Sequence, residues 1–357
     1  MNSFLEKIEK LNWQIFFVGV IIGMIAVFLL KISNGVHSLL NPIGANIETE
    51  NNNIFKSVLP KLAKKQNFYA LKPLKENFIP YAYANKFDIP VNAYIVTDFD
   101  SGEILAEKES AKRFPIASLT KIMTAVVALD LAVESEVFTV SKNASSMPPT
   151  KIGVVPKEKM TLKELLNAAL LTSANDATEV IKEGIDGKYN DKVFIKAMNE
   201  KAKILGLKDT SFTNPQGFDN KKNYSSAKDF AILSHYALTN YSLLAEIVKK
   251  DYEFLPKDNN HKQFDLYNWN GLLDVYPNVF GLKIGNTGNA LHTISIASRR
   301  ENKIVLVILL GAPGVLERDL WAAQLLDSGF EKLGNLPKIG VTSDMLTQKY
   351  STWKYFN

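Results

Sequence analysis

Segments with a β-strand pattern stand near both ends of the globular part of this chain, and helical segments fill the middle. Near its start, the run VNAYIVTDFDSGEILAEKES has two apolar stretches around a D-x-D-S-G turn, as expected of a hairpin. Near its end lie three more β-type runs, GLKIG, LHTISIASRR and KIVLVILLGAP. One sheet that contains all of these runs must combine strands from distant parts of the sequence. We therefore expect an α/β fold class.

Apolar residues at helical spacing predict the helices. The pattern runs from about Ser118 to Val133, and it returns in TLKELLNAALLTSANDATEVIKEGI, YNDKVFIKAMNEKAKILGL and ERDLWAAQLLDSGFEKL. Glycine and aspartate turns separate these segments.

Composition excludes several classes of function. The chain has 357 residues, 46% hydrophobic and 22% charged, which is ordinary for a globular protein of one large or two medium domains. The net charge of +5 comes from 42 basic and 37 acidic residues without a long basic run, so we expect no nucleic-acid binding. Cysteine is absent and the four histidines are far apart, so we expect no metal and no cofactor.

The N-terminal region predicts a membrane anchor. Leu11 to Leu30 are twenty consecutive uncharged residues between Lys10 and Lys31, long enough for a helix to cross a bilayer. A cleaved signal peptide is the competing interpretation, but no A-x-A site follows Lys31. We expect residues 1–10 to be a tail, 11–31 a transmembrane helix or uncleaved signal anchor, and 32–80 a polar linker.

Ser118 and Lys121 form a candidate nucleophile and base. They stand at positions i and i+3 of a predicted helix, so the lysine amine falls beside the serine hydroxyl. Lysine accepts the serine proton only if its pKa is depressed, and a second cation such as Lys283 would have that effect. Alone, the S-x-x-K pattern is weak evidence for a nucleophile and base, because many surface helices carry a capping serine and a solvated lysine.

Two further motifs follow in the sequence. Ser173-Ala174-Asn175 interrupts an apolar helical run, and Lys283-Ile284-Gly285 closes a β-type run. Taken singly, the first reads as a helix-end turn and the second as a strand leading into a turn. With Ser118 and Lys121, however, they resemble in order the S-x-x-K, S-D-N and K-T-G set of β-lactamases and penicillin-binding proteins.

The resemblance extends beyond these motifs to the low-molecular-weight penicillin-binding proteins, the D-alanyl-D-alanine carboxypeptidases. The segments RFPIASLTKIMTA, LTSANDA, FTNPQGFDNKKNYSSAKDFAIL and VLVILLGAPGVLERD resemble that family in family order. The resemblance implies a β-lactamase/transpeptidase-like fold, with a mainly antiparallel sheet flanked by helices and a helical subdomain. We place this catalytic domain at residues 81–336 and a C-terminal tail at 337–357.

The resemblance also implies residue roles. Ser118 would attack the D-Ala-D-Ala carbonyl and Lys121 would take its proton, with the Ser118 and Asn286 backbone N–H groups as the oxyanion hole. Ser173 would relay a proton to the leaving amine, Asn175 would bind the substrate amide, and Lys283 would tune the electrostatic field. The implied substrate-binding residues are Gly285, Asn286, Thr287 and Arg318, the last holding the terminal carboxylate. For Arg318, a solvated charge at the start of the last helix is the alternative.

Two features depart from the family. Ile284 replaces the hydroxyl residue that would hydrogen-bond the substrate carboxylate, and Thr287 is a candidate to compensate. Only about twenty residues follow Leu336, too few for the C-terminal β domain of many relatives. The aromatic residues there would either pack on the domain or contact lipid, and the sequence does not decide.

The implied activity is a serine-type D-Ala-D-Ala carboxypeptidase acting on peptidoglycan stem peptides and inhibited covalently by β-lactams. It would be anchored in the bacterial cytoplasmic membrane by a single span, with the catalytic domain on the extracytoplasmic side. The alternatives are a penicillin-binding regulator of low turnover, which Ile284 favours, a D,D-endopeptidase and a serine β-lactamase. No segment provides a convincing additional base for a β-lactamase, and the oligomeric state is not predicted.

Overall fold

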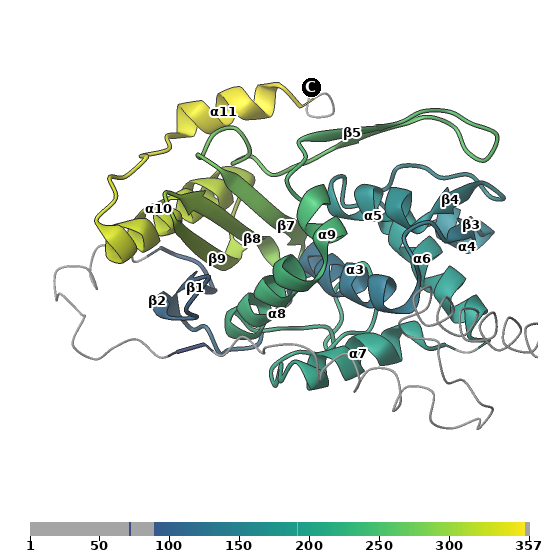
Figure 1. Cartoon of the computed structure of the whole chain (residues 1–357), viewed down its shortest axis with the longest axis horizontal. Helices are drawn as coiled ribbons and strands as arrows, with labels where there is room; N and C mark the ends of the chain where they lie inside the picture. The colour runs from purple at the N-terminus through teal and green to yellow at the C-terminus, as the bar shows by residue number, and fades with distance from the viewer. Residues whose placement is uncertain (1–70, 73–88, 191, 354–357) are drawn as a thin grey trace, which may run out of the picture. The chain divides into compact units, whose positions relative to one another are not determined.

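The computed structural model describes residues 71–72, 89–190 and 192–353, and it contains the predicted sheet. Its five antiparallel strands lie in the order β2-β1-β9-β8-β7 (Figure 1). They are β1 Ala93–Asp98, β2 Ile104–Lys108, β7 Val279–Thr287, β8 Leu291–Arg300 and β9 Lys303–Ala312. The hairpin of β1 and β2 pairs with β9, so one sheet combines strands from distant parts of the sequence, as predicted, and the antiparallel α/β fold is confirmed.

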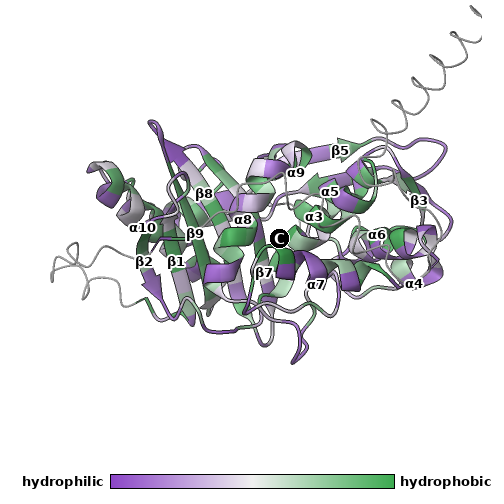
Figure 2. Cartoon of the chain, turned by 60° about the horizontal axis from the view of Figure 1, so that its bottom comes forward, coloured by the Kyte–Doolittle hydropathy of each residue, from purple (hydrophilic) through white to green (hydrophobic). Residues whose placement is uncertain are grey.

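Helices cover both faces of this sheet. Helix α10, Val315–Gly334, packs against β1, β2, β8 and β9, and α8, Ala227–Asn240, also packs against β1, β8 and β9. With both faces covered, β9 is buried along nearly its whole length, which explains its continuous apolar sequence (Figure 2). One end of the sheet is the edge strand β7, and the candidate site lies there.

In the sequence, a group of helices lies between the first two strands of the sheet and its last three, as predicted. The short helix η2, Ala117–Leu119, leads into α3, Thr120–Leu131. The other elements are β3 Val137–Thr139, α4 Lys142–Ser145, β4 Lys159–Thr161, α5 Leu162–Leu170, α6 Asn175–Lys188, α7 Phe194–Ile204 and α9 Ser242–Ile247. A capping box between Thr161 and Glu164 starts α5.

Some elements were not predicted. They include α4, α8, α9, the small β3–β4 pair, and the hairpin of β5 Tyr252–Leu255 with β6 Phe264–Tyr267. These strands are only three or four residues long, too short for a clear alternating pattern. Lys72, within the predicted linker, forms a bridge to Glu103 beside β2.

The predicted C-terminal tail contains helix α11, Ser343–Ser351, which packs against α10. Leu346 is buried, and the Trp353 ring lies edge-on to that of Trp269 at 5.5 Å between centroids. Of the two possibilities left open for the tail aromatics, Tyr350 and Trp353 therefore pack on the domain.

No helix within the described ranges is both long enough and apolar enough to span a membrane. The predicted membrane helix, residues 11–31, lies outside those ranges.

Candidate active site

Ser118 lies in the tight turn that precedes α3, pressed against the edge strand β7. Ala117 has φ 48°, which is unusual for a residue with a side chain. A Cβ at Gly285 would lie 2.8 Å from the Ser118 nitrogen, and one at Gly217 would lie 1.9 Å from the Ala117 oxygen. Glycine at both positions lets two other segments approach the serine backbone closely. Half-buried Ser118 is thereby held beside Gly285 and its neighbour Asn286.

Lys121 donates three short hydrogen bonds in the structure. Its Nζ lies 2.9 Å from Ser118 Oγ, 2.8 Å from Asn175 Oδ1 and 2.8 Å from the Gln216 carbonyl. Asn175 Nδ2 donates to the Pro148 carbonyl at 3.1 Å, which keeps Oδ1 directed at the lysine. A neutral amine has two N–H groups and one lone pair. When the two fixed carbonyl oxygens take the N–H groups, the lone pair is left for the Ser118 hydroxyl.

The surroundings of Lys121 favour this neutral form. Burial lowers the pKa of Lys121 well below its usual range, and the positive charge of Lys283 lowers it further. The carboxylate of Asp176 acts in the opposite direction but does not outweigh them. A lysine with a depressed pKa suits the task of general base for a serine nucleophile.

Ser173 and Asn175 stand at the start of α6. Ser173 has φ 63° and is 8% exposed, and Asn175 is the first residue of the helix. Asp176 accepts hydrogen bonds from the backbone nitrogens of Ile152, Gly153 and Val154. The start of α6 is thus tied to a neighbouring loop. Direct contacts join Ser118, Lys121 and Asn175, whereas Ser173 is placed here by its position before α6 alone.

Lys283 extends from β7 and is 4% exposed. Its Nζ donates to the Ile284 carbonyl at 3.0 Å. Burial lowers the pKa of Lys283 to about 7, and the nearby charge of Arg318 contributes to the shift. This lysine is therefore close to titration at neutral pH and is near enough to influence Lys121.

Two residues that follow Lys283 on β7, Ile284 and Thr287, have different environments. Ile284 packs against the apolar core formed with α10, so its side chain serves the fold on that face. Thr287 Oγ1 donates to Asp219 Oδ1 at 2.6 Å and accepts from the Ala290 nitrogen at 3.1 Å. Thr287 would have to break the bond to Asp219 before it could donate to a substrate carboxylate. Its bonds thus connect the β7–β8 turn to the loop of Asp219.

Arg318 lies in the first turn of α10 and is 2% exposed. The alternative of a solvated charge is wrong for this residue. Its Nε and Nη2 donate to the two carboxylate oxygens of Asp319 at 2.7 and 2.8 Å. Tyr350 of α11 donates to the same carboxylate at 2.8 Å. A guanidinium has five N–H groups, so the pair leaves donors for a second carboxylate.

Sequence reasoning missed three groups around this site. Gln216 contributes a backbone carbonyl, and Asp319 and Tyr350 hold the arginine. A carbonyl oxygen has no signature in the sequence, because every residue carries one. Asp319 directly follows Arg318, but side chains at i and i+1 of a helix usually point apart. Within the described ranges, no group of three or more acidic or histidine side chains is arranged to hold a metal.

The fold and the arrangement of Ser118 and Lys121 are those expected of a serine acyl-transfer enzyme with a lysine base. The family model described as D-alanyl-D-alanine carboxypeptidase matches residues 81–314. The chain therefore belongs to the D-alanyl-D-alanine carboxypeptidase family.

Relatives and solved structures agree with this assignment. The chain is 34% identical over 248 residues to D-alanyl-D-alanine carboxypeptidase DacF of Bacillus subtilis, a match covering 68% of this chain and 63% of that protein. It is 31% identical to DacB2 of Mycobacterium tuberculosis, covering 68% and 83%. The crystal structure of the Streptomyces K15 DD-transpeptidase superposes with a TM-score of 0.63 at 25% identity, covering 68% and 97%. The chain thus matches under two thirds of the length of the Bacillus protein.

Proposed function

We propose that this chain is a serine-type D-Ala-D-Ala carboxypeptidase that acts on peptidoglycan stem peptides. The observation that carries the proposal is the position of Lys121 Nζ, 2.9 Å from Ser118 Oγ, with two carbonyl oxygens placed to accept the N–H groups of the neutral amine. The names of the Bacillus and Mycobacterium relatives support the substrate class.

In the proposed reaction, Ser118 Oγ attacks the carbonyl carbon of the terminal peptide bond and Lys121 takes its proton. The Ser118 and Asn286 backbone N–H groups would stabilise the oxyanion. Ser173 would pass a proton to the departing D-alanine amine, and water would then hydrolyse the ester to restore Ser118. Arg318 would bind the terminal carboxylate beside Asp319, which suits the absence of a hydroxyl at Ile284.

The proposal also includes the location of the protein in the membrane and its inhibition by β-lactams. Residues 11–31 would anchor the chain in the cytoplasmic membrane, with the catalytic domain on the extracytoplasmic side. β-Lactams would acylate Ser118, as supported by the structure of penicillin-binding protein D2 from Listeria monocytogenes in its cefotaxime-bound form, 28% identical with a TM-score of 0.59.

The test uses the full chain in detergent, a fluorescent penicillin and a pentapeptide ending in D-Ala-D-Ala. We expect stoichiometric labelling and release of D-alanine from the wild type. Ser118→Ala should lose both activities while its melting temperature stays close to that of the wild type, since the change removes only one half-buried hydroxyl. An unlabelled wild type would refute Ser118 as a working nucleophile.

Other outcomes identify the alternatives. Labelling without D-alanine release would favour the regulator that Ile284 suggests, and Ile284→Thr should then restore release. Rapid loss of label with accumulation of hydrolysed penicillin would indicate a β-lactamase. Release from a cross-linked dimer in preference to the pentapeptide would indicate an endopeptidase.

A further inference from the structure

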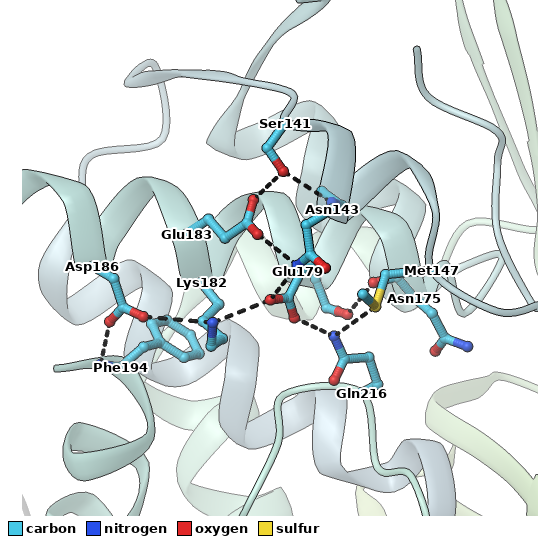
Figure 3. A network of polar contacts seen from close by, with 12 residues as sticks. Ser141, Asn143, Met147, Asn175, Glu179, Lys182, Glu183, Asp186, Phe194 and Gln216 are labelled. Carbon is cyan, nitrogen blue, oxygen red and sulfur yellow. Dashed lines mark hydrogen bonds and ion pairs between the residues drawn. The ribbon is translucent and has the colours of Figure 1, made fainter. Parts of the chain in front are cut away.

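The carboxylate of Glu179, on α6, contacts the side chain of Gln216 (Figure 3), and the main chain of Gln216 contacts Lys121. Glu179 is 7% exposed, and its Oε2 accepts a hydrogen bond from Gln216 Nε2 at 2.7 Å. The carbonyl of the same Gln216 accepts from Lys121 Nζ at 2.8 Å. The side chain of Gln216 therefore bonds to Glu179, and its main chain bonds to the base.

Glu179 is itself held in place from its other side. Lys182 Nζ lies 3.1 Å from Glu179 Oε1, and Asn143 Nδ2 lies 3.4 Å from the same oxygen. Lys182 also pairs with Asp186 at 3.6 Å, which fixes the lysine along the helix. A buried carboxylate is tolerated when it is paired and hydrogen-bonded in this way. Its position on a helix gives Gln216 a rigid partner.

Gln216 needs such a partner because it lies in the loop between α7 and α8. It is 2% exposed, and Gly217 after it has φ 93° and approaches Ala117 closely. Without Glu179, the Gln216 amide would keep only the 3.9 Å contact of Nε2 with Met147 Sδ, a weak acceptor, so the side chain would move toward water. The carbonyl on the same residue would turn with it, away from Lys121.

We propose that Glu179 is a positioning residue for the general base. By holding the Gln216 side chain, it keeps the Gln216 carbonyl on one N–H of Lys121 and so directs the lone pair of the amine at Ser118. The proposal rests on the function proposed above for Ser118 and Lys121.

The test separates binding from acylation in the full chain in detergent. Stopped-flow labelling with a fluorescent penicillin gives the dissociation constant of the non-covalent complex and the first-order acylation rate constant. Glu179→Ala should lower the rate constant about tenfold or more, as expected for a misplaced base, and leave the dissociation constant within about twofold. Glu179→Gln keeps an oxygen acceptor for Gln216 and should recover most of the rate.

Glu183→Ala is the matched control. Glu183 stands one turn further along α6 and accepts hydrogen bonds from Ser141 and Asn143, so it belongs to the same network without a bond to Gln216 in Figure 3. This variant should acylate within about twofold of the wild type. An equal loss in Glu183→Ala and Glu179→Ala would mean that the network only supports the fold, and it would overturn the proposal.

A double-mutant cycle tests the route through Gln216. Gln216→Met fills the space without an amide, and it should reproduce the loss of acylation rate. The double variant should acylate no more slowly than either single variant, because both changes break the same hydrogen bond between Glu179 and Gln216. Additive losses, or a wild-type rate in Glu179→Ala, would refute the proposal. If Glu179→Ala does not fold, the acylation rates of Gln216→Met and Glu179→Gln test the proposal. A slow Gln216→Met with a nearly wild-type Glu179→Gln would support it, and equal rates would refute it. An unlabelled wild type would instead refute the proposed function.

Discussion

Two buried lysines with lowered pKa values lie at the centre of this site. Lys121 has a pKa well below its usual range because of burial and the charge of Lys283. Lys283 has a pKa lowered to about 7 by burial and by Arg318. The base must be neutral to accept the Ser118 proton, whereas Lys283 lowers the pKa of the base only while it is charged. The two residues therefore require opposite protonation states for activity.

This arrangement predicts a bell-shaped pH dependence. The second-order rate constant for acylation should rise with pH as Lys121 loses its proton, and it should fall with a midpoint near pH 7 as Lys283 loses its own. Fluorescent-penicillin labelling from about pH 4 to 10 measures both limbs. Lys283→Arg keeps its charge across this range, so it should retain the acid limb and lose the alkaline one. An unchanged alkaline limb in that variant would exclude Lys283 as its source.

At the scale of elements, the site depends on how closely β7 approaches η2. The Ser118 backbone touches the strand at Gly285, where a Cβ would lie 2.8 Å from the Ser118 nitrogen and 3.0 Å from the Ala117 Cβ. Contacts of this length are shorter than side chains make, so the turn that holds the nucleophile would have to shift.

Gly285→Ala should therefore lower the acylation rate by about a hundredfold, since small displacements of reacting groups are costly. The fold should survive, because the clash is local to the edge of the sheet. Labelling kinetics and thermal unfolding measure the two effects. Gly288→Ala, in the next turn, places a Cβ with nothing within 4 Å and is the control. Equal rates in the two variants would show that the close approach is dispensable.

At the scale of the whole described domain, the C-terminal segment contacts the residue pair that includes Arg318, the proposed ligand of the substrate carboxylate. Helix α11 buries Leu346, and its Tyr350 donates to Asp319, which in turn holds the Arg318 fork. The helix is therefore connected to the residue proposed to bind the substrate carboxylate.

Truncation after residue 340 should lower the melting temperature by about 5 °C or more, because burial of side chains such as Leu346 is lost.

Tyr350→Phe keeps the packing and removes only the hydroxyl, so it should raise KM severalfold with little change in kcat. Thermal unfolding and pentapeptide hydrolysis measure these effects. Met345→Ala, on the exposed side of α11, is the control. An unchanged KM in Tyr350→Phe would separate α11 from substrate binding.

The contacts around Lys121 show how far the sequence could predict the site. Ser118 and Lys121 are three residues apart on one helical face, so their proximity follows from local geometry. Asn175 was also proposed, but only the resemblance to the family connected it with the lysine. Gln216 was not proposed at all, because it acts through its carbonyl, and only the path of the loop brings that atom to the base.

By itself, the sequence determined the strand–helix–strand order, the proximity of Ser118 and Lys121, and the family to which the chain belongs. These follow from local periodicity and from motifs whose residues are neighbours in the chain. Only the tertiary structure decided that Thr287 bonds Asp219, that Tyr350 bonds Asp319 beside the buried Arg318, and that Glu179 reaches the base through Gln216. Those contacts join segments whose separation in space is set by how α6, α10, α11 and the loops pack, and no local pattern encodes that distance.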